Sequence, residues 1–534
     1  MKKAVIILLV LTMILSLAAC GGNAQAPAGS AANQTPESAG SAAAPSNAAT
    51  PAEPKKEMTV AIAIDAGSLN PYDRLENIGR QTWISVYESL FEYGQGDLVP
   101  KPVLVDTYEF SEDQKTLTLN LKQGVLFHNG QEMKAEDVVF SFDILRVKKP
   151  SHMGDVDWDG IHAEGDYTVV IPFNSVQGNA LYYICNLYVL CKSYMESIPD
   201  TEWSSNCIGT GPYMWGECVP GSEYELLRFD GYREKKALDK ITIRVIPDAD
   251  VQKIELETGG VDMACSLSFA DAAAFAEDPN DGVNVTPSNQ IAILELVNLF
   301  PDPNSPLADL RVREAILYAL DLETINKVVY SGLGEAATAI YPSGVTAYKK
   351  ADNLRTYNVE KAKELLAEAG YPNGLTLDLY AQNTTVFQTL ADVLVGMGSQ
   401  AGINFNVISC DFATLEGYMN SGENSGVYTY RQYANGDPYI LVNQFFWPEN
   451  ATVKAYKQYT DEKFQECVDA RAEAMVLIDQ AARNEAYHKL MQVAYDRLYY
   501  APVVEYADQV AHSEAVKGFW MSGPIYHYED CYFE

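Results

Sequence analysis

The sequence is poor in the residues and motifs that build metal centres and hydrolase active sites. Its 534 residues include six histidines, which do not cluster at ligand spacing, and no CxxC pair. Because metal sites use closely spaced ligands, we expect no metal ion and no other cofactor. GxSxG and HExxH motifs, typical of serine and zinc hydrolases, are also absent. These absences argue against an enzyme.

Positive charge is also scarce. Lys and Arg total 38 against 72 Asp and Glu, which gives a net charge of −34. Nucleic-acid binding requires a basic face, so the sequence predicts no nucleic-acid partner. A solvated acidic surface keeps the protein soluble and repels it from anionic membranes. Attraction of a cationic ligand is the functional alternative for the same charge.

Long apolar runs are missing except near the amino terminus. Lys2-Lys3 precedes the apolar residues 4–15, a run too short to cross a membrane comfortably, so residues 1–19 are predicted to be a signal peptide. Leu17-Ala18-Ala19-Cys20 resembles the lipobox of bacterial lipoproteins, which implies cleavage before Cys20 and its lipidation. An ordinary signal peptide with an incidental Cys20 is the alternative. The Ala-, Ser- and Pro-rich residues 20–56 predict a flexible linker.

Eight cysteines follow Cys20. An even number in an exported protein permits disulfides, although the sequence does not choose among the connectivities. Cys207 and Cys218 are the favoured pair because we expect them to flank a short hairpin.

The stretch from Val99 to Arg146 predicts two short β-hairpins followed by a helix. The β-rich runs around Thr107 and Leu117–Leu121 are separated by turn residues, and Asn129-Gly130 marks a second turn. From Glu136-Asp137 onward, apolar residues recur at helical spacing behind an acidic first turn. A helix is therefore expected to pack onto these strands.

The same stretch resembles the signature of the family 5 extracellular solute-binding proteins, the peptide and nickel receptors of ABC importers. The matching residues are Tyr108–Ser111, Thr116–Leu121, Gly124–Gly130 and Ala135–Val139, followed by Gly209–Tyr213, Gly259–Asp262, Asp309–Asp321 and Tyr357–Tyr371. The resemblance implies an α/β, two-lobed periplasmic-binding-protein fold, class II-like and of cluster C, with an extra small lobe inserted in the first lobe.

The predicted organisation places these lobes along the chain, which is too long for one core. Lobe 1 is expected from 57–93 and 205–287, the small inserted lobe from 94–204, lobe 2 from 288–498, and a return to lobe 1 from 499–534. Helices are expected at Trp83–Phe91, where apolar residues have helical spacing, and over 461–500.

The most informative stretch for a ligand is 426–438, which resembles the family's strand and loop ending in Asp-Pro. Peptide receptors of the family carry an Asp for the peptide's amino terminus at the position of Ala434, so an ammonium would lack its partner unless another acid replaces it. Arg431 offers a fork for a carboxylate or phosphate, and the neighbouring tyrosines offer ring faces. A structural ion pair is the alternative for Arg431.

The resemblance also places the loop Glu76-Asn77-Ile78 at the cleft, with a solvated loop as the alternative for Glu76. Strand alternation predicts Tyr428 and Tyr430 on one face and Thr429 and Arg431 on the other. The predicted ligand-binding residues are Glu76, Asn77, Ile78, Tyr428, Tyr430, Arg431, Tyr433, Asn435 and Asp437.

These features together predict a lipid-anchored receptor on the outer face of the cell membrane. It would be a monomer that closes over a solute at a hinge and presents it to ABC permease subunits. An oligopeptide or peptide-like ligand is expected first, and a nickel chelate, haem, an opine-like conjugate or an oligosaccharide are the alternatives. An exported hydrolase, and a sensor or chaperone without a permease, are the competing classes.

Overall fold

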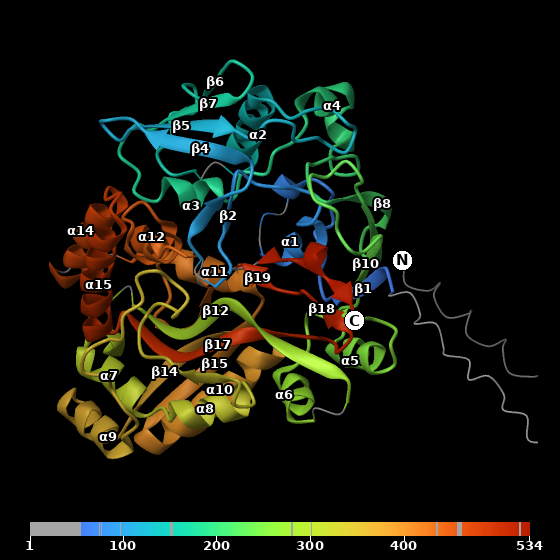
Figure 1. Ribbon diagram of the computed structural model, residues 1–534. Coiled ribbons are helices and arrows are strands. Elements are labelled where there is room, and N and C mark those ends of the chain that lie inside the picture. Colours follow the sequence, from blue (N-terminus) through green and yellow to red (C-terminus); the bar gives the residue numbers. More distant parts are fainter. Residues whose placement is uncertain are drawn as a thin grey trace, which may run out of the picture. The chain divides into compact units, whose positions relative to one another are not determined.

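The computed structural model describes residues 55–534 except 74, 76, 97, 150–152, 279–280, 301, 434–435, 457–461 and 523–524 (Figure 1). The predicted signal peptide, Cys20 and the linker up to residue 54 lie outside the described residues. Residues from Pro54 to Glu534 form one compact unit.

A large mixed sheet forms the centre of this unit. Its order is β15 (Ile403–Cys410), β14 (Leu375–Gln382), β16 (Gly426–Tyr433), β12 (Val283–Leu299), β17 (Tyr500–Ser513), β11 (Met263–Ala264), β1 (Glu57–Ile62), β10 (Lys240–Val245), β9 (Glu223–Arg228) and β8 (Tyr213–Val219), and β13 (Gly334–Ala336) pairs with β17. The mixture of parallel and antiparallel pairs, with helices along the chain between strands, gives the predicted two-lobed α/β fold.

Two long antiparallel strands, β12 and β17, join the two halves of the sheet, and both cross the middle of Figure 1. Their register shifts between Pro287 and Ile291 and again between Leu294 and Glu295. Such irregularities bend a strand and raise its local twist. The three strands β14–β16 lie on one side of this pair, and β1 and β8–β11 lie on the other.

A separate four-stranded sheet has the order β4 (Val105–Phe110), β5 (Thr116–Leu121), β7 (Thr168–Pro172) and β6 (His162–Glu164). It is accompanied by α2 (Ala135–Lys148), whose start is fixed by a hydrogen bond from the Lys134 N–H to Asp137 Oδ2 at 2.8 Å. The first predicted hairpin and the helix are thus confirmed. The second predicted hairpin is reduced to a turn at Gly130 with a single bridge between Leu126 and Glu132.

The predicted helix over Trp83–Phe91 is wrong, because the helix of this region ends where the predicted one begins. Helix α1 spans Asn77–Trp83, and β2 (Phe91–Tyr93) begins where the prediction still has helix and pairs with β3 (Pro100–Pro102). Val86, Tyr87 and Leu90 are almost fully buried in an irregular segment. The apolar residues of this segment therefore follow burial on all sides of the chain. Their helical spacing does not mark the buried face of a helix.

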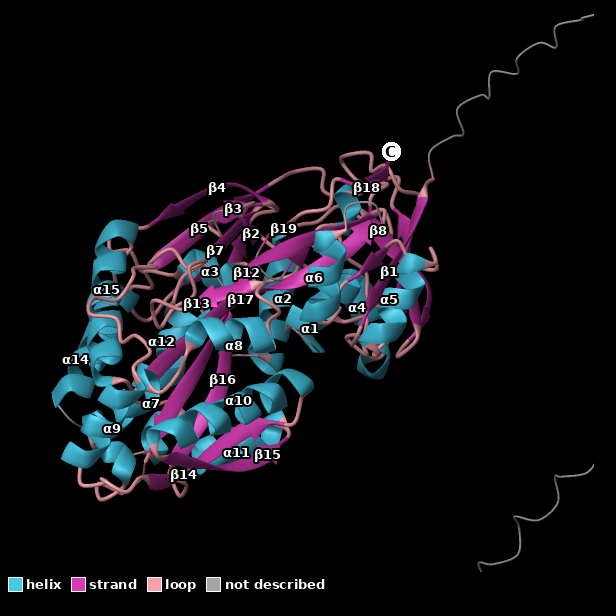
Figure 2. Ribbon diagram, turned by 90° about the horizontal axis from the view of Figure 1, so that it is seen from below, coloured by secondary structure: helices cyan, strands magenta, loops and turns pink. Residues whose placement is uncertain are grey.

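Among the remaining helices, α10 and α11 lie beside β14–β16 (Figure 2), whereas α14 packs against α15 and α12. Their bounds are α3 (Ala180–Ile184), α4 (Lys192–Ser197), α5 (Ala249–Glu257), α6 (Phe269–Glu277), α7 (Leu310–Tyr318), α8 (Leu322–Val329), α9 (Val359–Glu368), α10 (Thr385–Ala401), α11 (Phe412–Ser421), α12 (Tyr439–Phe446), α13 (Ala451–Ala455), α14 (Glu462–Met475) and α15 (Gln480–Arg497). The last predicted helical region is thus two helices. Within the described chain no helix is both long and apolar enough to span a bilayer.

The predicted Cys207–Cys218 disulfide is wrong. All eight described cysteines are free. The buried Cys207 thiol lies 3.6 Å from Met195 Sδ, whereas the Cys218 thiol contacts the Gly216 carbonyl at 3.7 Å within β8. Cys218 is thus a strand residue, and the expected hairpin between the two cysteines does not form.

Candidate ligand-binding site

Arg431 on β16 is the cationic centre of the candidate site. Its side chain keeps exposed surface, although protein surrounds it closely enough for burial to oppose its charge. The guanidinium lies over the Tyr433 ring at 4.8 Å, and Nη1 donates a long 3.4 Å hydrogen bond to Tyr506 Oη. Among the described residues, Tyr506 is the only hydrogen-bond acceptor for this guanidinium.

Asp508 on β17 lies on the same face of the sheet as Arg431. Strand β12 separates the two strands, and Ala292 pairs with Tyr433 on one side and with Tyr506 on the other. Because paired residues point to one face and alternate residues share it, Arg431, Tyr433, Tyr506 and Asp508 lie together. Tyr433 Oη donates to Asp508 Oδ2 at 3.0 Å. We name these four residues the Arg431 cluster.

Aromatic packing holds the Arg431 cluster in place. The Tyr506 ring stacks on Tyr330 with centroids 4.3 Å apart, and Phe269 meets Tyr506 edge-on at 5.5 Å. Burial raises the pKa of the Tyr433 hydroxyl well above its ordinary value, and Asp508 adds to the effect. The hydroxyl therefore stays protonated and remains a donor to Asp508.

The other two predicted tyrosines of β16 point to the opposite face, as the alternation predicts. Tyr428 is fully buried and stacks on Tyr380 with centroids 4.3 Å apart. This burial leaves no surface for a ligand, so the structure favours a core role over the predicted ligand contact. Tyr430 Oη accepts a 2.5 Å hydrogen bond from Gln444 Nε2 and lines a separate cavity of about 470 Å³ with Trp447.

Asp437 is also buried, with no exposed side-chain surface. Its carboxylate accepts hydrogen bonds from Arg483 Nε at 2.9 Å, Tyr487 Oη at 2.9 Å and the Tyr439 N–H at 3.0 Å. Burial raises the pKa of this carboxyl, and Arg483 opposes the rise. Asp437 therefore fixes the turn before α12. A buried carboxylate of this kind cannot make the predicted contact with a ligand, so it would affect ligand binding only through the turn.

The segment predicted to face the strand from the first lobe opens α1 instead of forming a loop. Asn77 and Ile78 are the first residues of α1, and Glu76 and Asn435 lie outside the described residues. Helix α1 packs against β20 (Ile525–Tyr526).

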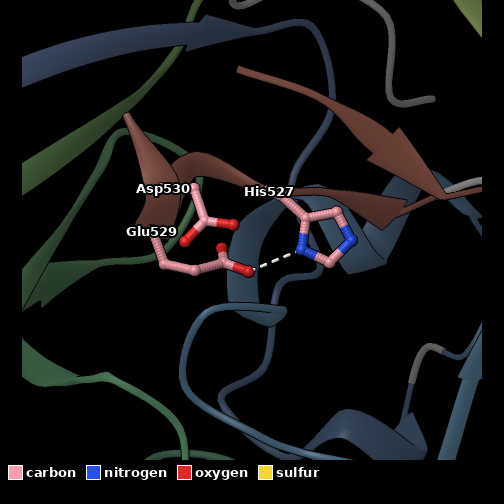
Figure 3. A group of neighbouring side chains, drawn as sticks. All are labelled: His527, Glu529 and Asp530. Carbon is pink, nitrogen blue, oxygen red and sulfur yellow. Dashed lines mark hydrogen bonds and ion pairs between the residues drawn. The ribbon is translucent and has the colours of Figure 1, made fainter. Parts of the chain in front are cut away.

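A second polar cluster surrounds His527 and lines a cavity of about 180 Å³ (Figure 3). His527 Nδ1 lies 2.6 Å from Glu529, Nε2 lies 2.7 Å from Glu92, and Trp520 stacks on the imidazole at 3.5 Å. Burial opposes a charge on His527, but the two carboxylates outweigh it and raise its pKa to about 10. His527 is therefore an imidazolium at neutral pH.

His527, Glu529 and Asp530 lie close enough together to be considered as metal ligands. Asp530, however, already accepts hydrogen bonds from Lys236 Nζ at 2.8 Å and Trp520 Nε1 at 2.7 Å. Glu529 Oε2 accepts another from Ser85 Oγ at 3.0 Å. Because Lys236 and protonated His527 already neutralise these carboxylates, the arrangement favours an ion-pair network over a metal centre.

Comparison with known proteins decides the family. Residues 99–452 match the model of the bacterial extracellular solute-binding proteins, family 5 Middle. The chain belongs to this family. It is a solute-binding protein of the ABC-importer class, extracytoplasmic by family, and not an enzyme.

Several curated relatives cover most of the chain. Heme-binding protein A of Haemophilus influenzae is 25% identical over 82% of this chain and 84% of its own length. The dipeptide-binding protein of Escherichia coli is 25% identical over 78% and 82%, and the glutathione-binding protein GsiB of Salmonella typhi is 26% identical over 90% and 94%. Family members thus bind peptides or other small ligands and work with ABC permeases.

Solved structures support the fold. NikA from Brucella suis in complex with Fe(III)-EDTA gives a TM-score of 0.80 at 20% identity, over 90% of this chain and all of that one. DppA from Helicobacter pylori in complex with the peptide STSA gives 0.74 at 22% identity, over 90% and 98%. At these identities the likeness establishes the periplasmic-binding-protein fold and does not choose a ligand.

The family's Gly-Thr-Gly-Pro-Tyr motif has a packing role here. A Cβ on Gly209 would lie 2.2 Å from the Val86 carbonyl, and one on Gly211 would lie 2.5 Å from the Ser85 carbonyl. Gly211 N–H donates to Val86 O at 3.0 Å, and His128 Nε2 lies 3.1 Å from Gly211 O. The glycines therefore allow two backbone segments to touch.

Tyr506 and Asp508 are not among the residues predicted from the sequence, where 499–534 is expected only as a return to lobe 1. The signal available was Glu505-Tyr506-Ala507-Asp508-Gln509, a polar interruption in a strand whose other residues are mostly apolar. Acidic residues inside an otherwise buried strand require partners, which makes them candidates for a site.

Proposed function

We propose that this protein is a lipid-anchored receptor that captures an oligopeptide or peptide-like solute outside the cell and delivers it to an ABC permease. The observation that carries the ligand class is the exposed Arg431 guanidinium, which lies against the Tyr433 ring and makes one long hydrogen bond, to Tyr506, among the described residues. A planar guanidinium binds a carboxylate through two parallel hydrogen bonds. The site is therefore suited to a ligand carboxylate lying between ring faces.

The names of the relatives are compatible with this chemistry. A dipeptide, glutathione, haem, the peptide STSA and Fe(III)-EDTA all carry carboxylate groups. A peptide-like ligand remains our first choice, and a nickel chelate, haem, an opine-like conjugate or an oligosaccharide remain the alternatives. An oligosaccharide without acidic groups fits Arg431 least well.

Capture would work by closure at a hinge. In the proposed organisation, lobe 1 consists of residues 57–93, 205–287 and 499–534, and the small lobe (94–204) is inserted in it. Lobe 2 consists of residues 288–498. The paired strands β12 and β17 run between lobe 1 and lobe 2. Contacts with the ligand from both lobes would stabilise the closed form, and the permease would respond to its population. The receptor would act as a monomer, with ATP hydrolysed by other subunits.

Native mass spectrometry of the chain from Lys55 onward, as purified, tests the ligand class. We expect a retained ligand that denaturing release identifies as short peptides with free carboxyl groups. An R431Q variant should weaken rebinding about 10- to 100-fold, because a charged hydrogen-bonded contact contributes about 1.5–3 kcal/mol. The matched control is R146Q, since Arg146 forms an exposed pair with Asp159. Recovery of a metal complex or sugar, or wild-type affinity in R431Q, would refute the peptide assignment.

The lipid anchor has its own test. The full chain should fractionate with membranes, and a C20S variant should appear in the soluble extracytoplasmic fraction, because a lipidated cysteine is the expected attachment. Equal solubility of the two forms would instead support the ordinary signal peptide.

A further inference from the structure

We infer that the cavity of about 470 Å³ beside Tyr430 binds a cationic organic group of the solute, of the kind that a lysine or arginine side chain carries. Glu416 is the residue that selects this group. The cavity is lined by residues of β16 and of helices α11, α12 and α13, among them Glu416, Tyr430, Gln444 and Trp447, and we name it the Tyr430 cavity. The inference rests on the proposed function and specifies the chemistry of the solute.

The walls of the Tyr430 cavity are joined to one another by hydrogen bonds. Gln444 Nε2 of α12 donates to Tyr430 Oη of β16 at 2.5 Å, and Thr452 Oγ1 of α13 donates to Asn420 Oδ1 of α11 at 2.6 Å. Glu416 and Asn420 are four residues apart on α11, so they share one face of this helix. The volume falls within the range of small-molecule sites, about 300–1,000 Å³. The cavity is therefore built from elements that are held in place relative to one another.

Glu416 is the one charged side chain among the described residues that line the cavity. It is half-buried, and it forms neither an ion pair nor a side-chain hydrogen bond with another described residue. Burial raises the pKa of its carboxyl, and no cation among the described residues opposes the rise. A carboxylate that loses water without gaining a partner in the protein is unfavourable, and a cation on the solute would supply that partner.

Arg471 of α14 packs near this wall, but it is already engaged within the protein. Its guanidinium lies over the Trp447 ring at 5.6 Å, and Nε donates to Asn443 Oδ1 at 2.8 Å. Arg471 is not a lining residue of the cavity, and no ion pair joins it to Glu416. It therefore holds Trp447 and Asn443 in the wall and leaves the carboxylate to the solute.

The rest of the lining matches the other part of such a group. Met419, Ile440 and Trp447 add apolar surface beside the carboxylate, and Ile440 and Trp447 remain partly exposed. Lysine and arginine side chains join an apolar stem to a charged head, so each part has a counterpart in the cavity. Gln444 Oε1 accepts no hydrogen bond from a described residue and offers a second acceptor to the charged head.

A metal ion fits the Tyr430 cavity less well. Ca²⁺ takes about six to eight oxygen ligands. The Oδ1 atoms of Asn420, Asn443 and Asn450 each accept a hydrogen bond within the protein already, from Thr452 Oγ1, Arg471 Nε and the Thr452 N–H. A single carboxylate is left, which suits an organic cation.

The test measures the affinities of synthetic tripeptides by isothermal titration calorimetry on residues 21–534. Three pairs of peptides place lysine, or its uncharged isostere norleucine, at the first, second or third position between alanines. At one or more of these positions the wild type should prefer lysine by about 10-fold, the lower end for a charged hydrogen-bonded contact because Glu416 is only half-buried. E416Q should bring this ratio to near unity, and E416K should reverse it.

Two variants provide controls. E423Q removes an exposed acid that follows α11 and does not line the cavity, so it should keep the wild-type ratio. R431Q acts on the opposite face of β16, so it should weaken both peptides of a pair alike and keep their ratio. A ratio that fell equally in E416Q and E423Q would assign the preference to the net charge of the protein and would overturn the role of Glu416.

Agmatine, a small organic cation without a carboxylate, separates the inference from the proposed function. If wild type binds lysine and norleucine peptides equally at all three positions, the role of the cavity is refuted and the peptide receptor stands. If wild type binds agmatine in a Glu416-dependent way but no tripeptide, the peptide assignment fails and the inference stands. Binding of neither overturns both. The wild-type comparison alone can overturn the inference, so the result does not depend on E416Q folding correctly.

Discussion

The buried pair of Asp437 and Arg483 connects two distant parts of the molecule. Arg483 Nη1 also donates to the carbonyls of Gly178 at 2.6 Å and Leu477 at 2.7 Å. D437N would leave the guanidinium buried without its counter-ion, which costs about 3–5 kcal/mol. We expect a loss of this size in the free energy of unfolding measured with urea. The affinity of the folded fraction should change little, because Asp437 is predicted to act through the turn.

The matched control is E364Q, which removes a pair between Lys361 and Glu364 on the surface of α9. Such pairs contribute less than about 1 kcal/mol. Equal stabilities of D437N and wild type, or a selective loss of affinity in D437N, would show that Asp437 contacts the ligand as the sequence predicted.

His527 makes stability depend on pH in the alkaline range. Its pKa is about 10 in the folded protein and about 6.5 in an unfolded chain. The imidazolium therefore stabilises the fold fully below pH about 6.5, and this contribution disappears as the pH rises towards 10. We expect the free energy of unfolding to fall over this range by an amount on the order of a few kcal/mol, and H527Q to remove that part of the slope.

The control for His527 is H162N, because His162 is exposed and lies 3.6 Å from Glu164. The free energy of unfolding of each variant, measured with urea at each pH, is subtracted from that of the wild type. The difference gives the contribution of one histidine, because other groups that titrate at high pH contribute equally to both proteins. A slope that survives in H527Q but not in H162N would show that the Glu92–His527–Glu529 arrangement does not hold a proton.

At the scale of elements, the close approach of the Gly209–Tyr213 segment to Ser85 and Val86 fixes two segments against each other. Tyr213 N–H donates to Ser85 O at 3.1 Å, next to the bond from Gly211. G211A would place a methyl group 2.5 Å from the Ser85 carbonyl. Overpacking of this kind costs about 1–3 kcal/mol. We expect G211A to lower the urea midpoint by a corresponding amount.

At Gly417, unlike Gly211, a substitution with alanine meets no neighbouring atoms. It is an exposed residue of α11 with open space around its Cβ position. G417A should stabilise the protein by up to about 1 kcal/mol, because alanine favours a helix. If G211A were as stable as G417A, the contact between the two segments would be looser than the geometry indicates.

The elements also show which parts of the fold the sequence can predict. Helix α2 was predictable because its acidic first turn and its apolar spacing agree. The segment after Trp83 has similar apolar spacing, but Ser85 and Val86 give their carbonyls to a distant segment, which no local pattern reports. The same holds for the site. Arg431 stands in a recognisable motif, whereas Asp508 joins it only through the register of β12 with two strands.

At the scale of the whole molecule, the described chain is held together without covalent cross-links. Burial raises the pKa of the Cys207 and Cys265 thiols to about 12, which keeps them protonated and unreactive at neutral pH. Cys218 and Cys410 are the half-buried members of the set. Thiol titration with Ellman's reagent on residues 55–534 should therefore detect at most these two in the folded protein and all eight after denaturation.

The unfolding midpoint should accordingly be the same with and without a reductant, since no disulfide restrains the unfolded chain. A protein from an oxidising compartment that gave fewer than eight thiols after denaturation would contradict the described arrangement. A fall in the unfolding midpoint on addition of a reductant would also contradict the described arrangement. In either case the buried Met195 contact of Cys207 would have to be rearranged, because a thiol packed there at 3.6 Å from Sδ has no cysteine partner beside it. Retention of all eight thiols would mean that the fold depends on its packed core and its buried ion pairs.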